Sequence, residues 1–234
     1  MRFLSALKND IRYQFRYGFY FLYMFISVIY AIVLTVCPAE YKQAASSVVV
    51  LTDPATLGMF FIGGIWLLEK GEGLHEFWRI SPLRPLEYIV SKTMSLVFIS
   101  VLSADMIVLA VFRGTADYLQ LTIGVCAGSM IFTAIGLIVA SYALSVNHYM
   151  LIATPPAVLF TVPPILGAFG ITHPVLELFP GTALWRIIGH SIGYARDGGI
   201  LPWTILLIWL ALTLFVANAR IPAAMRGEKV WLIH

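Results

Sequence analysis

Residues 69–92 of the chain read EKGEGLHEFWRISPLRPLEYIVSK and lie between two long apolar runs. Eight of the chain's 27 Lys, Arg, Asp and Glu residues fall in this stretch. The runs on either side are each about as long as a helix that crosses a bilayer. A short loop this rich in charge is typical of the water-exposed cytoplasmic loops of membrane proteins. We expect this loop to contact another protein.

The composition around this loop excludes a soluble globular domain. Hydrophobic residues make up 60% of the 234 residues, charged residues 12%, and the mean hydropathy is +0.87. A soluble domain carries about 25% charged residues. Charge-poor segments occur at 18–37, 48–68, 93–112, 119–145, 149–170 and 200–219. Each can span ~30 Å of hydrocarbon. The sequence predicts an all-α integral membrane protein: residues 1–234 form a single transmembrane domain of six helices.

The distribution of basic residues predicts the orientation, because Lys and Arg are retained on the cytoplasmic side of short loops. Six spans place both termini on one side. Eleven basic residues fall on that side: Arg2, Lys8, Arg12, Arg16, Lys70, Arg79, Arg84, Lys92, Arg220, Arg226 and Lys229. Four fall on the other: Lys42, Arg113, Arg186 and Arg196. We expect a multi-pass protein of the plasma membrane with both termini cytoplasmic. The basic pI therefore reflects topology and does not indicate nucleic-acid binding.

Two segments outside the spans have their own patterns. Residues 1–17 place Leu4, Leu7, Ile11 and Phe15 at helical spacing, with Ser5, Asn9, Arg12 and Arg16 on another flank. This predicts an amphipathic helix on the inner membrane surface, and the alternative is a water-exposed start of the first span. Residues 172–198 are too polar to span, so we expect two short re-entrant helices that dip into the outer leaflet.

Prolines and glycines mark special places within the spans. The pairs Pro155-Pro156 and Pro163-Pro164 remove amide donors, which predicts a kinked or broken fifth span. Two tracks of small residues allow close helix packing: Gly58, Gly63 and Gly64, and then Gly124, Gly128, Ser129 and Gly136. We expect both tracks to pack helices within the chain.

Common catalytic and nucleotide-binding motifs are absent from the sequence. It has no G-x-x-x-x-G-K-[ST], no H-E-x-x-H and no G-x-S-x-G. Cys37 and Cys126 alone support neither a disulfide framework nor a metal site. We expect no enzyme activity and no cofactor in this chain, so ATP, if used, is bound by another polypeptide.

Two carboxylates lie within apolar runs, namely Asp53 and Asp105. An ionised carboxylate inside lipid costs several kcal/mol, and no Lys or Arg lies within a span to pair with it. Asp53, which precedes Pro54, could instead cap a helix. Asp105 could hydrogen bond to a neighbouring helix. The functional hypothesis is that both line a substrate pathway for a cationic or amphipathic molecule.

Several motifs, taken together, resemble a known family. They are Asp53-Pro54-x-x-Leu57-Gly58, Gly63, Leu68-Glu69-Lys70-x-Glu72-Gly73, Ser81-Pro82-Leu83-x-Pro85-x-Glu87-Tyr88 and Ser91-Lys92. In this order and spacing they resemble the six-span permease subunits of type-two ABC exporters, most closely the drug-export branch associated with fluoroquinolone efflux. The resemblance extends over nearly the whole chain.

The resemblance implies a coupling helix near residues 72–80 that fits a groove on a separate ATPase subunit. The implied coupling residues are Glu69, Glu72, Gly73, Leu74, Glu76, Phe77, Trp78 and Arg79, with Leu74, Phe77 and Trp78 as apolar anchors. Leu74 stands where such permeases usually have threonine. The resemblance also implies the N-terminal surface helix and the outer re-entrant helices.

Six spans make half a pathway, so the resemblance further implies two permeases, identical or paralogous, and two ATPases that carry ATP and Mg²⁺. The substrate would be a small amphipathic molecule. One alternative is a non-transporting membrane anchor or immunity-type subunit, and another is a membrane enzyme.

Overall fold

The computed structural model describes residues 2–53, 58–81, 83–171, 173–194 and 199–226. Within these ranges every regular element is a helix. The helices are α1 (Arg2–Arg16), α2 (Phe19–Val36), α3 (Ala39–Thr52), α4 (Gly58–Gly71), α5 (Leu74–Ile80), α6 (Pro85–Phe112), α7 (Tyr118–Ala140), α8 (Val146–Ala168), α9 (Pro174–Glu177), α10 (Pro180–Ser191) and α11 (Ile200–Met225). The side chain of Arg79 lies outside the described part, as do Pro54, Leu57, Pro82, Arg196 and Lys229.

Five of the described helices are long and apolar enough to cross a membrane, namely α2, α6, α7, α8 and α11. They correspond to five of the six predicted spans, and the chain is a multi-pass membrane protein. The sixth predicted span, residues 48–68, is described in two parts, at the end of α3 and in α4, which have 14 residues each. Residues 54–57 between them lie outside the described part, so this span stays a prediction.

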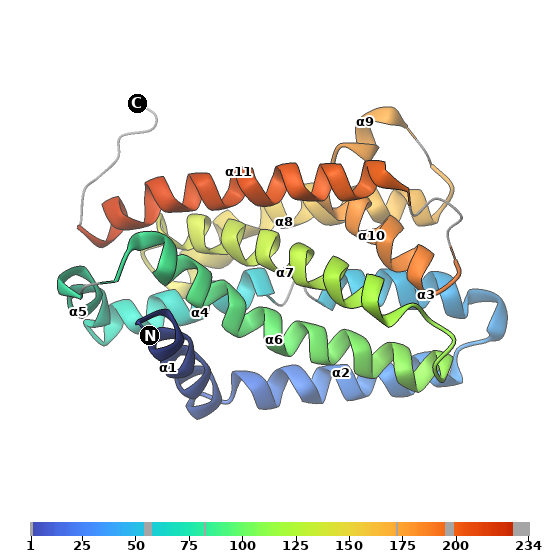
Figure 1. Cartoon of the computed structure of the whole chain (residues 1–234), viewed down its shortest axis with the longest axis horizontal. Coiled ribbons are helices and arrows are strands. Elements are labelled where there is room, and N and C mark those ends of the chain that lie inside the picture. The colour runs from blue at the N-terminus through green and yellow to red at the C-terminus, as the bar shows by residue number, and fades with distance from the viewer. Residues whose placement is uncertain (1, 54–57, 82, 172, 195–198, 227–234) are drawn as a thin grey trace.

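The long helices run roughly side by side and form a bundle with two distinct ends (Figure 1). At one end lie α1, α5, the start of α6 and the last turn of α11. At the other end lie α9, α10 and the connection from α2 to α3. The first and last described helices therefore reach the same end of the bundle, which is also where the charged segment 69–92 lies.

The α7 helix occupies the centre of the bundle and contacts α4, α6, α10 and α11. Its glycines let these neighbours approach. A Cβ at Gly128 would lie 2.4 Å from the side chain of Leu184 on α10, and one at Gly136 would lie 2.5 Å from the carbonyl oxygen of Met59 on α4. The prediction that the glycine tracks pack helices within the chain is confirmed at these positions.

The four prolines of α8 do not interrupt it, since the helix is continuous from Val146 to Ala168. The fifth span is therefore not broken, whereas a kink, the other outcome that the prolines predict, stays a prediction. Pro164 has no N–H for the carbonyl of Phe160, and that carbonyl lies instead against α10 at Gly181, where a Cβ would come within 2.0 Å of the oxygen. A helix with freed carbonyls remains regular where neighbouring protein covers them.

Two short helices, α9 and α10, occur in the polar segment 172–198, as expected. The side chains of α10 are largely buried against α3, α7, α8 and α11, including Leu184, Ile187 and Ile188. The Arg186 guanidinium donates to the Glu177 carboxylate of α9. The α10 helix is therefore an integral layer of the bundle at the end opposite α5.

Candidate functional site

The α5 helix is a seven-residue element placed across the end of the bundle by a glycine turn. Gly73, which precedes it, has φ = 73°, a left-handed conformation that glycine adopts without a Cβ penalty. Glu72, Gly73 and Glu76 are exposed, while Leu74 and Trp78 are half-buried. Phe77 is 58% exposed and Ile80 is 78% exposed. The helix thus presents large apolar groups and an acidic group away from the bundle.

His75 forms the inward face of α5. Its ring is buried and lies 4.1 Å, centroid to centroid, from the indole of Trp66 on α4. Burial, together with the positive charges of Lys92 and Lys70, lowers the pKa of His75 to about 4. The imidazole is therefore neutral at physiological pH and acts as a packing group that holds α5 on α4.

A buried ionic cluster lies directly beneath α5. The Lys92 ammonium on α6 donates to Asp10 Oδ1 of α1 at 2.5 Å and also to the Glu69 carboxylate of α4. All three side chains are at most 3% exposed. Ser91 Oγ donates to the second oxygen of Asp10, and Tyr88 Oη donates to Glu69 Oε2 at 3.1 Å. Because both carboxylates are paired and hydrogen-bonded, the cluster fixes three helices against one another.

Aromatic rings complete the surroundings of the Lys92 ammonium. Its Nζ lies 5.5 Å from the ring centroid of Tyr88, 5.8 Å from that of Trp78 and 6.0 Å from that of Tyr13. Distances up to about 6 Å permit cation–π attraction. Trp78 belongs to α5 and Tyr13 to α1, so the same cation also contacts the helix that presents the exposed face.

Glu72, in the turn before α5, is bound to the end of α1. The hydroxyls of Tyr13 and Tyr17 both donate to its carboxylate, the first at 3.2 Å. Burial, and next the nearby Glu72 charge, raise the pKa of Tyr13, so its hydroxyl remains a donor. Together with the Asp10–Lys92 pair, this contact joins α1 to both ends of the charged segment.

These contacts show where Glu69, one of the expected coupling residues, lies. Glu69 is 2% exposed and fully engaged with Lys92 and Tyr88, so it supports α5 from within and does not belong to the outward face. Glu87 is also engaged locally, since it accepts from the Arg84 amide in the first turn of α6 at 2.9 Å. Part of the charge density of residues 69–92 therefore serves internal structure.

The α1 helix has a buried face and an exposed apolar face. Ala6, Asp10 and Gln14 are buried against α6, where Gln14 Nε2 donates to Ser95 Oγ at 2.6 Å. Leu4 and Phe15 of the apolar stripe are 66% and 74% exposed. The predicted stripe is thus exposed at Leu4 and Phe15 and half-buried at Leu7 and Ile11, whereas Ala6, Asp10 and Gln14 are the residues that are fully buried.

Asp53 is fully buried within a hydroxyl network among α2, α3, α6 and α7. Ser103 donates to its Oδ2, and the Ser103 hydroxyl in turn lies 2.5 Å from that of Ser27. The Tyr23 hydroxyl donates to the Asp53 carbonyl at 3.1 Å. Asp53 Oδ1 has no hydrogen-bond partner among the described residues. Asp53 is therefore held through its Oδ2, while the predicted cap of a helix that begins at Pro54 lies outside the described residues.

Asp105 lies elsewhere on α6 and is half-buried. Thr122 of α7 donates to both its oxygens, at 3.2 and 3.3 Å. Ser103, which binds Asp53, is two residues away, and residues two apart on a helix point about 200° apart. Asp53 therefore packs on one face of α6, and Asp105 projects from a different face of the same helix. The described contacts do not bring the two carboxylates into one site.

Comparisons with known proteins identify the family of this chain. The model of the fluoroquinolones export permease protein family matches residues 1–217. The chain belongs to this family. Two fluoroquinolones export permease proteins of Mycobacterium tuberculosis, one from strain CDC 1551 / Oshkosh and one from strain ATCC 25618 / H37Rv, are each 27% identical to it over 205 residues. The matches cover 87% of this export permease and 85% of each relative.

Sequence reasoning missed Asp10 and the role of Lys92 in this permease. Asp10 could have been noticed because it lies four residues from Ala6 and from Gln14, which makes a continuous small and polar stripe beside the apolar one. Lys92 lies within α6, directly before the apolar part of that helix, where an unpaired charge would be unfavourable. No sequence signal shows that these two residues pair with each other.

Proposed function

We propose that this permease is the transmembrane subunit of an ATP-driven drug exporter, and that it couples to a separate ATPase subunit through α5. The observation that carries the proposal is the exposed face of Phe77 and Ile80 on a short helix whose other side is fixed by His75 and the Lys92 cluster. Large apolar and aromatic groups on an otherwise charged surface are typical of binding hot spots.

The contacts beneath α5 are consistent with a mechanism in which a movement of α5 is transmitted to the long helices. A force applied to α5 passes into α4 through the Gly73 turn and the His75–Trp66 contact, and into α1 and α6 through Lys92. When the ATPases close on ATP, we expect α5 to move with them and the long helices to re-pack between inward-open and outward-open states. Glu72, Glu76, Phe77 and Trp78, with Gly73, Leu74 and Arg79, form the coupling segment in this proposal, and Glu69 supports it from inside.

This assignment implies an orientation and an assembly. The end of the bundle that carries α5 faces the cytoplasm, so both termini are cytoplasmic and the protein lies in the plasma membrane. Five membrane-length helices together with α3 and α4 form half of a pathway, and a second permease subunit, identical or paralogous, supplies the other half. The exposed stripe of α1 lies on the inner leaflet. ATP and Mg²⁺ bind to the ATPase.

The substrate class follows from the named relatives and from the membrane carboxylates. The relatives are named for export of fluoroquinolones. A small amphipathic drug with a cationic group would find its counter-charge at Asp53 or Asp105, which are the two carboxylates in the apolar part of the bundle. We therefore propose that at least one of them contributes to the substrate pathway.

The experiment that tests the proposed function is purification of the tagged permease from native membranes in mild detergent, followed by mass spectrometry of the proteins that co-elute. We expect a stoichiometric ABC-type ATPase, whose hydrolysis in the reconstituted complex is stimulated by fluoroquinolone. A complex without any drug stimulation would favour a non-transporting anchor. Activity of the purified chain without nucleotide would favour a membrane enzyme.

A further inference from the structure

Asp53 takes part in two chains of hydroxyl groups that α2, α6 and α7 form around the end of α3. In the first chain, Ser103 contacts Asp53 Oδ2, and its Oγ lies 2.5 Å from Ser27 Oγ. Ser27 in turn donates to the Tyr23 carbonyl at 2.8 Å. Asp53, Ser27 and Ser103 are 0% exposed, so no water-sized space adjoins them. The hydrogens in these contacts must therefore come from the side chains themselves.

The hydrogens of this first chain are too few if Asp53 is ionised. The chain has three contacts, namely Asp53–Ser103, Ser103–Ser27 and Ser27 with the Tyr23 carbonyl. Each serine hydroxyl donates one hydrogen, and an ionised carboxylate or a carbonyl donates none. One contact would then be two oxygens facing each other without a hydrogen. A hydrogen on Asp53 Oδ2 removes this conflict, because Asp53 then donates to Ser103, Ser103 to Ser27, and Ser27 to the carbonyl.

The second chain needs no additional hydrogen. Ser129 donates to Ser100 at 3.1 Å, Ser100 Oγ lies 2.8 Å from Tyr23 Oη, and Tyr23 donates to the Asp53 carbonyl at 3.1 Å. Three hydroxyl groups thus supply three contacts. The missing hydrogen is therefore specific to the chain that ends at the carboxyl group.

No described Lys or Arg side chain balances a charge on Asp53. The helices α2, α3, α6, α7, α8 and α10 contain three such residues in all. They are Lys42, which donates to the Thr35 carbonyl, Lys92, which binds Asp10 and Glu69, and Arg186, which binds Glu177. The histidines of these helices, His148 and His190, contact Leu144 and Gln120. Tyr23 is the titratable side chain in contact with Asp53, and the network residues of α6 and α7 are serines. Burial without a positive partner favours the neutral acid.

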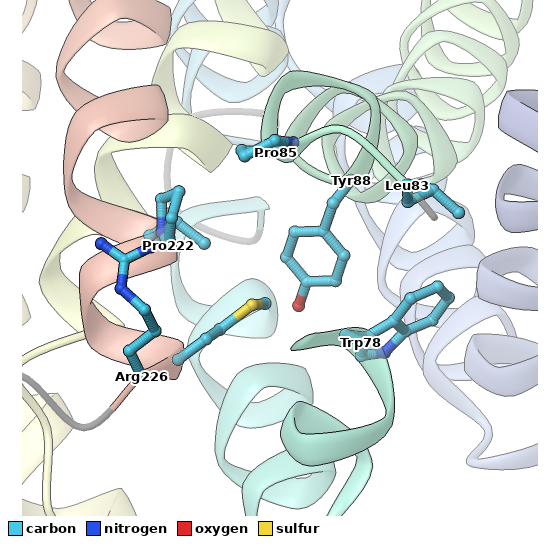
Figure 2. A pocket seen from close by; sticks show the side chains of 8 residues that line it. Trp78, Leu83, Pro85, Tyr88, Pro222 and Arg226 are labelled. Carbon is cyan, nitrogen blue, oxygen red and sulfur yellow. The ribbon is translucent and has the colours of Figure 1, made fainter. Parts of the chain in front are cut away.

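The two pockets at the α5 end do not reach this network. One, of about 200 Å³, lies where α5, the start of α6 and the last turn of α11 meet, and Trp78 and Tyr88 form one of its walls (Figure 2). Tyr88 precedes Ser103 by 15 residues on α6, which is about 22 Å along the helix axis. Neither this pocket nor the one between α1 and α5 is lined by a residue of the Asp53 network. Because Asp53 is also 0% exposed, exchange of a proton with water requires movement of the helices.

We propose that Asp53 is a proton-binding site, which carries a proton on Oδ2 in this conformation and releases it when the surrounding helices separate. A proton needs no cavity, so the site is compatible with complete burial. On opening, the O–H bond of the acid breaks, the proton passes to an entering water molecule, and water solvates the carboxylate. Closure returns the proton from water to Oδ2.

The proton site changes when Asp53 can act as a counter-charge. In the described conformation the acid is neutral and offers no charge to a cation, whereas the opened bundle presents a carboxylate. This consequence rests on the proposed function, in which Asp53 contributes to the substrate pathway. The proton site itself does not, since it follows from the contacts of the permease alone.

The test is infrared spectroscopy of the purified full-length permease in an ester-free detergent near pH 7, without an ATPase. A protonated carboxylic acid absorbs above the amide I band, and an ionised carboxylate absorbs below it. We expect the native permease to show an acid band that Asp53→Asn removes. Since Asp53 Oδ1 accepts no hydrogen bond from the described residues, this band should lie at the upper end of the acid range. Asp117→Asn is the matched control, because it removes an exposed carboxylate at the start of α7, and it should leave the band unchanged.

Ser103→Ala removes the acceptor of the acid hydrogen and should shift the same band, which assigns it if Asp53→Asn does not fold. The absence of an acid band that depends on Asp53 or Ser103, or equal effects of Asp53→Asn and Asp117→Asn, would overturn the proton site.

Release of the proton is tested in the complex with the ATPase, trapped with ATP and orthovanadate. The acid band should then disappear. A band that persists in a trapped complex of an active exporter would overturn release on opening. An acid band in a permease that exports no drug would support the proton site and count against the proposed function, so the two can fail separately.

Discussion

Lys92 Nζ on α6 lies 2.5 Å from Asp10 Oδ1 on α1, and both side chains are buried. The same ammonium binds Glu69 on α4, so one cation balances two carboxylates from different helices. Removal of one member of a buried ionic cluster leaves the others desolvated and unpaired, which usually destabilises a protein by about 3–5 kcal/mol. The ionic cluster beneath α5 thus joins residues that are distant in the sequence. Glu69 lies 59 residues and Lys92 lies 82 residues after Asp10.

We predict that Lys92→Met lowers the stability of the permease by about 3–5 kcal/mol, because Asp10 and Glu69 lose their counter-charge. Thermal unfolding in detergent measures the change. Lys70→Met, which removes an exposed lysine of α4, should change stability by no more than about 0.5 kcal/mol. Adding Asp10→Asn and Glu69→Gln to Lys92→Met should recover part of the loss. A triple variant as unstable as Lys92→Met would refute the electrostatic explanation.

Protonation of His75 should destabilise the α4–α5 contact in acid. Its folded pKa of about 4 lies below the ordinary value of 6.5, so the unfolded chain binds the proton more strongly. The stability due to neutral His75 is fully present above about pH 6.5 and is lost as the pH falls toward 4, by up to about 3 kcal/mol. Unfolding measured from pH 7.5 to 4 should show this loss. His75→Phe, which keeps the stacking on Trp66, should remove this part of the pH dependence.

Phe77→Ala should weaken association with the ATPase at least tenfold, since an exposed aromatic anchor on α5 is lost. The melting temperature of the isolated permease should hardly change, because Phe77 is 58% exposed. Phe169→Ala is the matched control, as Phe169 is 81% exposed just after α8 at the other end of the bundle. If both variants retain the ATPase equally well in a pull-down, α5 is not the coupling helix.

Gly136→Ala should destabilise the permease by at least about 1–3 kcal/mol, because the new methyl group would lie 2.5 Å from the Met59 carbonyl oxygen. Gly71→Ala, at the end of α4, introduces the same methyl group where no atom lies within 4 Å. That control should be neutral. Equal melting temperatures of the two variants would show that α4 and α7 are not packed this closely.

Asp53→Asn should reduce export of a cationic fluoroquinolone more than export of a neutral amphiphile, because the amide keeps the hydrogen bond with Ser103 and removes the charge. Asp105→Asn provides the comparison at the second carboxylate. Drug accumulation in cells that express equal amounts of each variant measures the effect. Normal export of cationic drugs by both variants would exclude a counter-charge role for either aspartate.

The sequence alone determined the properties that depend on local composition. Twenty apolar residues cannot satisfy their backbone in lipid except as a helix, so the span positions could be predicted to within a few residues for α2, α7 and α8. The short α5 helix could be placed near residues 72–80 through the family resemblance. The prolines of α8 predicted a kinked or broken span, and only the packed bundle shows that the helix is continuous and that the Phe160 carbonyl lies against α10.

The tertiary structure decided what depends on residues far apart in sequence. No sequence pattern links Asp10 to Lys92, and only the packing of α1 on α6 makes them an ion pair. The family resemblance implied that Glu69 is a coupling residue, yet its side chain turns inward to the same lysine. The pocket beside Trp78 likewise exists only because the last turn of α11 returns to α5 and α6. Hydrophobicity and helix propensity act over a few residues, whereas buried charge pairs and cavities depend on how helices meet.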